Sequence, residues 1–546
     1  MQSKVIDGLL LKQMVGAGLT WLRTNQQTVN ALNVFPVPDG DTGTNMLLTM
    51  TSAYNEIAEQ GSHSAGVITA GVAQGALMGA RGNSGVILSQ LWRGFSRSLH
   101  GKDTIDVASL AAAFVEARDT AYKGVVRPVE GTILTVSKDI AAEAVLAAQE
   151  EDDPLVVLRR CVDAADRSVQ NTPELLPILK QAGVVDSGGK GLFFILEGMI
   201  RFLDGETLDA AVISVQPLSA MNLENVLEEV EEGQDWEVVI DFRPTDGFDL
   251  TSFYNHLETI GTSIQVGEGE GMYRMHIHTE MEKRYEPIDY ILTLGTITKV
   301  AMENLLAQME NLENEPGSNR LEFAPVEPGQ IAVVAVSPGQ GLSRIFASLG
   351  VAAIISGGQT MNPSTKDILD TFENLPTNKV IILPNNKNII LAANQAKEVT
   401  VKQVRVIPSV NVPQGLSAML HLVPDGNLDK VVEKMSRAME AILVGEITIA
   451  TRSVEIDDVA VREGQVIALL NGKLEVASDS LEHACLELLE KAKIENYELV
   501  TMFYGEELKK SEANHIADII REKYPNLEIE IQDGGQPHYQ LILSIE

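Results

Sequence analysis

The first 205 residues have the pattern of a domain built almost entirely from helices. Apolar residues recur at helical spacing over residues 3–26 and 105–122. Small residues dominate residues 65–80, which indicates helices that pack closely against each other. Polar segments that contain glycine interrupt the helical patterns near residues 40, 82, 131 and 188. The sequence therefore predicts an all-helical domain over residues 1–205, with its candidate functional residues in these breaks.

The first break is the run Asn-Val-Phe-Pro-Val-Pro-Asp-Gly-Asp-Thr-Gly-Thr-Asn-Met at residues 33–46. Its prolines hold the approach extended, and helix-forming residues begin after Gly43. Asp39 and Asp41 can direct two carboxylates at one hard cation such as Mg²⁺. The loop amides and the hydroxyls of Thr42 and Thr44 can donate to phosphate oxygens at the helix N-terminus. The alternative is an ordinary turn with an aspartate as helix N-cap.

Three further breaks have a similar composition. In the second break, residues 81–88, glycines allow backbone amides to approach an anion, and Ser84 can donate its hydroxyl. The third break, residues 127–135, places a proline, an acid and a glycine ahead of a helix. In the fourth break, residues 184–192, Asp186 has two alternative roles: an acceptor for a sugar hydroxyl, or a helix N-cap. A simple loop between two helices is the alternative for the second break.

With these motifs the chain resembles a known family. The run at residues 33–46 is similar to the nucleotide-binding subunit of dihydroxyacetone kinase, and more closely to the fatty acid kinase A protein. That protein phosphorylates a fatty acid held by a separate binding protein. The resemblance implies an all-α helical barrel with ATP and Mg²⁺, in which Asp39 and Asp41 are the catalytic metal ligands. The nucleotide-binding positions that it implies are Thr42, Gly43, Thr44, Asn45, Gly82, Asn83, Ser84, Gly85, Thr132, Asp186 and Gly188. A third aspartate of the dihydroxyacetone kinase pattern is absent here, and Asn33 is its candidate substitute.

Residues 230–312 have the pattern of a small α/β domain. Strands are expected over residues 236–242 and 272–278, with a helix over 250–260 and a final helix over roughly 287–310. His276 and His278 lie on one face of their strand. In the fatty acid kinase A family a cysteine on the earlier strand is associated with this pair. Because that strand has no cysteine here, we expect a polar sheet face or donors to an acyl-binding partner rather than a zinc site.

Residues 325–546 alternate apolar strands with helices. The continuous apolar runs at residues 331–336, 352–355, 379–383 and 404–407 predict a parallel sheet covered on both faces. The loops after these runs, including residues 356–365, should lie at the carboxyl edge of the sheet, where such sheets bind ligands. This part resembles the C-terminal region of fatty acid kinase A, which is similar in fold to DegV-like fatty-acid-binding proteins. The resemblance leaves open whether it binds lipid or forms a docking or dimer surface.

Composition restricts the classes of partner. The chain has 76 acidic and 42 basic residues and a net charge of −34, which repels nucleic acid and anionic lipid. Cys161 and Cys485 lie far apart in helical patterns that favour buried free thiols. There is no apolar signal region at the start, and no apolar run reaches the length of a membrane span. We therefore expect a cytoplasmic protein.

The resemblance implies phosphoryl transfer from ATP to the carboxylate of a fatty acid presented by an acyl-loaded DegV-like protein. Such a carboxylate is already ionised at pH 7, so the reaction needs no strong general base. Catalysis would depend on positioning of the reactants and on neutralisation of charge on the phosphoryl oxygens. One alternative is a kinase of a small hydroxylated metabolite such as dihydroxyacetone. Another is a non-catalytic scaffold that senses ATP. A homodimer formed through an α/β domain is also expected.

Overall fold

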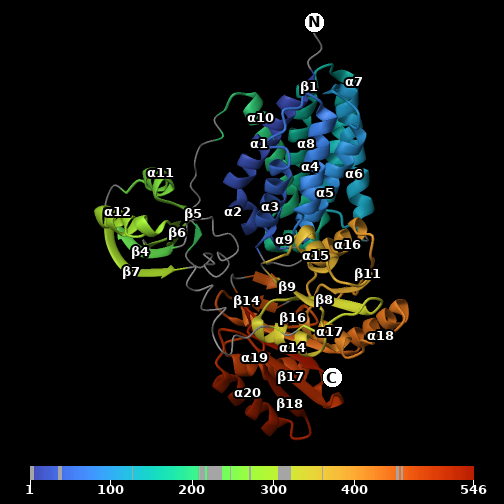
Figure 1. Cartoon of the computed structure of the whole chain (residues 1–546), viewed down its shortest axis with the longest axis vertical. Coiled ribbons are helices and arrows are strands. Elements are labelled where there is room, and N and C mark those ends of the chain that lie inside the picture. Colours follow the sequence, from blue (N-terminus) through green and yellow to red (C-terminus); the bar gives the residue numbers. More distant parts are fainter. Residues whose placement is uncertain are drawn as a thin grey trace. The chain divides into compact units, whose positions relative to one another are not determined.

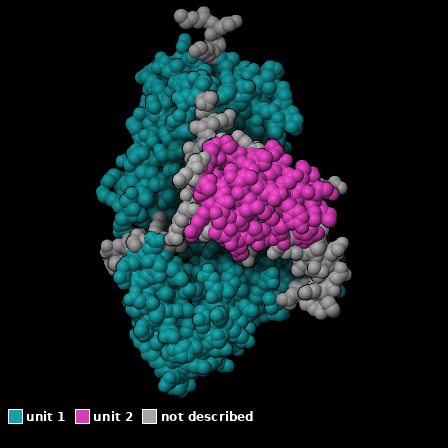
Figure 2. Space-filling view, turned by 90° about the vertical axis from the view of Figure 1, so that its left-hand side faces the viewer, with its two compact units in different colours: residues 1–208, 321–546 teal, residues 209–320 magenta. Residues whose placement is uncertain are grey.

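The computed structural model describes most of the chain in two compact units. One unit joins Met1–Leu208 with Leu321–Glu546, and the other is Asp209–Arg320 (Figure 2). The described residues are 5–34, 40–125, 127–206, 208, 216–217, 236–245, 248–269, 272–304, 321, 323–359, 361–450, 454–456 and 459–546. None of the helices within these ranges has the length and apolar character needed to cross a membrane.

The N-terminal region is helical, as predicted (Figure 1). A short antiparallel pair, β1 (Ile6–Asp7) with β2 (Thr104–Ile105), ties its first helix to a later loop. Its helices are α1 (Gly8–Thr24), α2 (Gln26–Ala31), α3 (Thr42–Asn55), α4 (Ala65–Met78), α5 (Gly82–Ser98), α6 (Val107–Gly124), α7 (Ile133–Glu150), α8 (Pro154–Leu175), α9 (Pro177–Ala182) and α10 (Ser187–Leu203). One continuous apolar core connects these helices, except α9. The barrel arrangement stays a prediction.

Glycines allow the close helix packing that the small-residue pattern predicted. A Cβ atom built on Gly75 of α4 would lie 2.4 Å from the carbonyl oxygen of Ser52 on α3. A Cβ atom on Gly94 of α5 would lie 2.3 Å from the carbonyl oxygen of Glu116 on α6. Real Cβ atoms do not approach other atoms so closely, so the helices meet through backbone at these positions.

The helical core contains an apolar cavity of about 70 Å³. Side chains from several helices line it, including Met14 of α1, Trp92 of α5, Phe114 of α6, Ile140 of α7 and Leu196 of α10. Aromatic rings continue along one wall, where Phe95 meets Trp92 and Phe114 edge to face. The helices therefore surround a space that their side chains do not fill.

The C-terminal region begins with a parallel sheet, in agreement with its apolar runs. Among the described residues four strands pair in the order β11-β10-β8-β9. They are β8 (Ile331–Ser337), β9 (Ala353–Ser356), β10 (Lys379–Leu383) and β11 (Gln403–Val406). One core joins the sheet to α14 (Gln340–Ser348), α17 (Val412–Met419) and α18 (Leu428–Ala441), and another joins it to α15 (Thr365–Glu373) and α16 (Ile390–Val399).

A mixed sheet follows, with the order β16-β15-β12-β19-β17-β18 in the residues that the structure describes. Helices α19 (Leu481–Lys491) and α20 (Lys510–Lys523) pack on it around a separate apolar core. The strands are β12 (Leu443–Ile449), β15 (Val466–Leu470), β16 (Lys473–Ser478), β17 (Leu499–Tyr504), β18 (Glu528–Asp533) and β19 (Tyr539–Ile545), with a small hairpin of β13 (Val454–Ile456) and β14 (Val459–Val461) beside them.

The helical and C-terminal regions, which the sequence presents as separate domains, pack together within one unit. Ala80 and Val86, on either side of the second break, are buried in the apolar core between the parallel sheet and α15 and α16. The amide of Thr365 donates to the carbonyl of Ala80 over 3.1 Å. The second break is therefore an interface with the C-terminal region.

The other unit is an α/β fold with the sheet order β3-β5-β6-β4-β7 over its described residues. Its elements are β3 (Gln216–Pro217), β4 (Trp236–Pro244), α11 (Leu250–Ile260), β5 (Gly261–Gly269), β6 (Met272–Thr279), a 3-10 turn (Met281–Lys283), α12 (Glu286–Leu294) and β7 (Gly295–Asn304). The prediction of a helix over residues 287–310 is wrong over Gly295–Asn304, and residues 305–310 lie outside the described residues. Gly295 ends the helix, and the β-branched residues that follow pair with β4 as a strand.

Candidate functional site

Asp41 lies at the start of α3, where the sequence placed the metal site. It is 7% exposed and occupies the N-cap position, but its side chain makes no cap hydrogen bond to the described residues. Instead, its Oδ2 accepts a hydrogen bond of 2.5 Å from Nδ2 of Asn362, in the loop after β9. Asp39, the other predicted ligand, lies outside the described residues. The simple N-cap alternative therefore does not account for the Asp41 carboxylate.

The first turn of α3 is bound by Asn30 of α2. Oδ1 of Asn30 accepts from the amides of Gly43 at 2.7 Å and Thr44 at 3.1 Å. The Thr44 hydroxyl accepts from Nδ2 of Asn30 and from Nε2 of Gln26. These groups were predicted to bind phosphate, and in this structure a side chain of the protein binds them instead. Their phosphate contact stays a prediction that requires Asn30 to move.

The second break forms the first turn of α5. Gly82 has φ of +57°, and a Cβ atom there would lie 2.5 Å from Nδ2 of Asn45. A Cβ atom on Gly85 would lie 2.4 Å from the hydroxyl of Thr49. Both glycines therefore allow the start of α5 to pack closely against α3. The start of α5 has no side-chain cap among the described residues, which leaves its first amides available to an anion. Asn83 and Ser84 are half-buried in this turn.

Thr132 is the N-cap of α7. Its hydroxyl accepts from the amide of Leu134 and donates to the carbonyl of Val129. Nearby, the hydrogen bond from Lys138 holds the pKa of Glu130 below its usual value. Thr132 therefore has a structural role, and its nucleotide contact stays a prediction.

Asp186 is the N-cap of α10, which is one of its two predicted roles. It is 5% exposed, and its Oδ2 accepts from the amide of Gly189 over 2.7 Å. Burial raises the pKa of this carboxyl to about 6, against the lowering effect of backbone hydrogen bonds. The contact of Asp186 with a sugar hydroxyl stays a prediction.

Contacts connect the four breaks to one another. The hydroxyl of Ser187 donates to that of Thr42 over 3.1 Å and links the first and fourth breaks. A Cβ atom on Gly188 would lie 3.3 Å from Cβ of Ile133, which links the third and fourth. The approach of Gly82 to Asn45 links the second to the first. The structure therefore gathers the predicted positions around the N-termini of α3, α5, α7 and α10.

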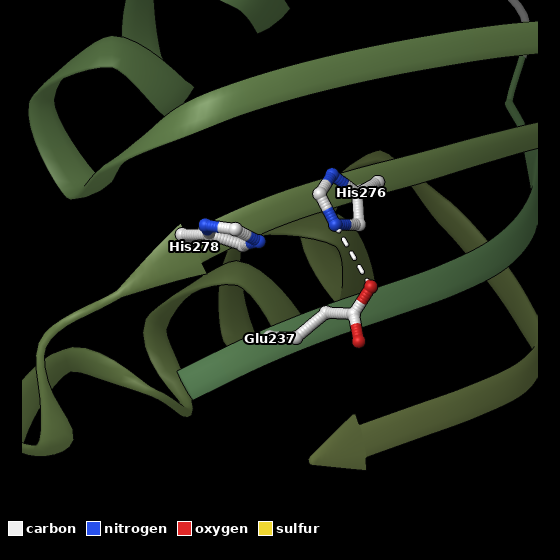
Figure 3. A group of neighbouring side chains, drawn as sticks. All are labelled: Glu237, His276 and His278. Carbon is white, nitrogen blue, oxygen red and sulfur yellow. Dashed lines mark ion pairs between the residues drawn. The ribbon is translucent and has the colours of Figure 1, made fainter. Parts of the chain in front are cut away.

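A second cluster lies in the other unit, where Glu237 of β4 faces His276 and His278 of β6 (Figure 3). Oε1 of Glu237 lies 2.9 Å from Nε2 of His276. Both histidines are fully buried, and among the described residues neither ring nitrogen of His278 has a hydrogen-bond partner. Burial lowers the pKa of His278 and favours its neutral form.

This cluster corrects one expectation for the histidine pair and adds a residue to the other. An exposed polar sheet face is wrong because both rings are buried. Glu237 lies opposite His278 in the strand register and is a candidate third ligand in place of the missing cysteine, so a zinc role stays untested. Two imidazoles and a carboxylate within 4.8 Å of one another fit one transition-metal ion or zinc. The unsatisfied nitrogens of His278 support this fit.

The loops after the parallel strands border a small pocket of about 40 Å³. Pro338, Gly357, Asn385 and Asn411 contribute to its wall, as the carboxyl-edge prediction required. Glu446 from β12 also lines it, and burial raises the pKa of this carboxyl to about 7.

Sequence reasoning missed Asn30, Asn362 and Glu237. The alternation of β4 puts Glu237 on a defined face, so pairing it with β6 would have found the cluster. Asn362 is 321 residues from Asp41, and no local pattern connects the two.

Comparison with known proteins gives matches along the chain. The DAK2 domain family matches residues 36–201, the FakA-like (fatty acid kinase A-like) middle domain residues 233–312, and the FakA-like C-terminal domain residues 332–546. Protein YloV of Bacillus subtilis is 40% identical over 562 residues, covering 100% of both chains.

Two solved structures are similar to parts of the chain. Dihydroxyacetone kinase from C. freundii, in complex with AMP-PNP and Mg²⁺, is 18% identical with a TM-score of 0.29, covering 36% of this chain and 34% of that one. The fatty acid kinase B3 protein of Streptococcus pneumoniae, loaded with linoleic acid, is 14% identical with a TM-score of 0.28, covering 40% and 99%.

Proposed function

Because this chain belongs to the fatty acid kinase A-like family, we propose that it is an ATP-dependent kinase that phosphorylates a fatty acid carboxylate. The fatty acid would be presented by a separate, acyl-loaded DegV-like protein, and the product would be an acyl phosphate. The cofactors would be ATP and Mg²⁺.

The observation that supports this proposal most is the position of Asp41. Its buried carboxylate lies at the N-terminus of α3 and binds Asn362, whose Nδ2 would lie 3.6 Å from a Cβ atom on Gly82 at the start of α5. The start of α5 has no side-chain cap among the residues that the structure describes. A carboxylate and free helix amides are the groups that hold a hard cation and a phosphate together. Asp41 and, as predicted from the sequence, Asp39 would hold Mg²⁺.

The reaction needs no strong base in this chain. An oxygen of the ionised carboxylate attacks the γ-phosphorus, and the bond from that phosphorus to the β,γ-bridging oxygen breaks, which releases ADP. Mg²⁺ held by Asp41 and Asp39 would supply charge neutralisation for the phosphoryl oxygens. The first turn of α5, with Asn83, Ser84 and Gly85, would orient the phosphates through amide and hydroxyl donors.

The test combines the purified chain with ATP, Mg²⁺ and an acyl-loaded DegV-like protein. We expect acyl phosphate, measured by trapping with hydroxylamine, and a loss of about a hundredfold or more in rate for Asp41→Asn. Asp425→Asn, an exposed change outside the site, is the control. Consumption of dihydroxyacetone instead would support the kinase of a small metabolite. Nucleotide binding without turnover of either substrate would support the ATP-sensing scaffold.

The cytoplasmic location and the homodimer belong to the same proposal. A mass measurement by light scattering on the full chain tests the homodimer directly.

A further inference from the structure

Side-chain contacts anchor the loop after β9 beside the candidate metal site. The guanidinium of Arg81 donates to the carbonyl of Asn362 over 3.1 Å and pairs with Asp367 at 3.2 Å. Ser364 and Asp367 form a capping box that fixes the start of α15. Pro363 restricts the backbone of Asn362 to extended conformations. The side chain of Asn362 therefore reaches Asp41 from a well-anchored backbone.

Asn362 has an amide oxygen that the fold does not use. The residue is 3% exposed, and its Oδ1 has no hydrogen-bond partner among the described residues. A buried amide oxygen without a partner costs free energy. Its Nδ2, by contrast, donates to Asp41. Rotation of the amide would exchange the two atoms and turn the oxygen toward the carboxylate, an arrangement that is favourable only with a cation between them.

We propose that Asn362 of the C-terminal region supplies an oxygen ligand to the divalent cation held by Asp41. This inference rests on the proposed function, because it assigns a further ligand to the same site. Without the cation, Nδ2 of Asn362 binds the carboxylate; with the cation, Oδ1 replaces it. Amide and carboxylate oxygens are ligands that Mg²⁺ and Mn²⁺ accept. The C-terminal region would then complete the site of the helical region within the same chain.

The test measures binding of Mn²⁺ to the full chain by electron paramagnetic resonance of the free ion, with AMP-PNP present. We expect Asn362→Ala to weaken Mn²⁺ binding about tenfold, because one oxygen ligand is lost. Asn362→Asp keeps an oxygen at this position and should bind Mn²⁺ at least as tightly as the unmodified chain.

Gln395→Ala is the matched control. Gln395 is also a buried amide of the C-terminal region, 4% exposed, and its Oε1 also has no partner among the described residues. Its Nε2 donates to the carbonyl of Leu77 and to the hydroxyl of Ser89, across the same interface but away from Asp41. We expect unchanged Mn²⁺ affinity for this variant, with circular dichroism confirming that each variant folds.

Three results would overturn the inference. They are unchanged affinity in Asn362→Ala, equal loss in Gln395→Ala, and failure of Asn362→Asp to restore binding. In each case the unmodified chain still binds Mn²⁺, so the proposed function survives. If the unmodified chain bound no Mn²⁺, both proposals would fail together.

Discussion

The buried N-cap Asp186 should contribute less to the stability of the helical region at neutral pH than at low pH. Its pKa is about 6 in the folded chain against an ordinary value of 3.8, so the folded state binds the proton more tightly. The stabilising effect of the proton is complete below about pH 4 and is lost as pH rises through 6. The difference corresponds to about 3 kcal/mol. Asp186→Asn keeps an acceptor for Gly189 and removes the charge.

We therefore expect Asp186→Asn to raise the free energy of unfolding by about 2 kcal/mol at pH 7.5. This value allows about 1 kcal/mol for the weaker hydrogen bond of a neutral cap. The gain should disappear near pH 4. Urea unfolding followed by tryptophan fluorescence measures it, in a Trp236→Phe background that leaves Trp21 and Trp92 of the helical region as reporters.

Asp106→Asn is the control for Asp186→Asn. Asp106 is the exposed N-cap of α6, and the Ser109 hydroxyl lowers its pKa, so its stabilising effect is present above the unfolded pKa and is lost at low pH. This variant should lose stability at pH 7.5. If Asp186→Asn showed no gain at pH 7.5, or the same gain at pH 4, the burial argument would be refuted.

Two further predictions concern other parts of the chain. Gly75→Ala should destabilise the helical region by about 1–3 kcal/mol, because the new methyl group would meet the carbonyl of Ser52; urea unfolding checks this, and an unchanged midpoint would contradict the close approach of α3 and α4. Glu237→Gln should weaken Co²⁺ binding at the cluster with His276 and His278 by about tenfold or more, seen in the visible absorption of the bound ion; equal spectra for both chains would exclude Glu237 as a ligand.

The elements of this fold follow largely from local patterns. The periodicity of the helices and the continuous apolar runs of β8 and β10 depend on neighbours in sequence, which is why they were predictable. The apolar residues after Gly295 fit either a helical or a strand period, and their pairing with β4 makes this segment a strand.

The site was less predictable because its partners come from distant parts of the chain. The motif identified Asp41, but nothing near it indicates that Asn362 binds it or that Asn30 binds the amides of α3. Thr132 and Asp186 illustrate a second reason. The residue types that cap helices also bind phosphates and sugars, so sequence alone leaves both roles open.

The apolar cavity among the helices has a consequence for the response to compression. A folded region with an unfilled interior occupies more volume than its atoms require, and unfolding removes that excess. Raised hydrostatic pressure therefore shifts the equilibrium of the helical region toward its unfolded form. The folded helical region therefore has a larger volume than its unfolded form, by the part of the cavity that unfolding removes.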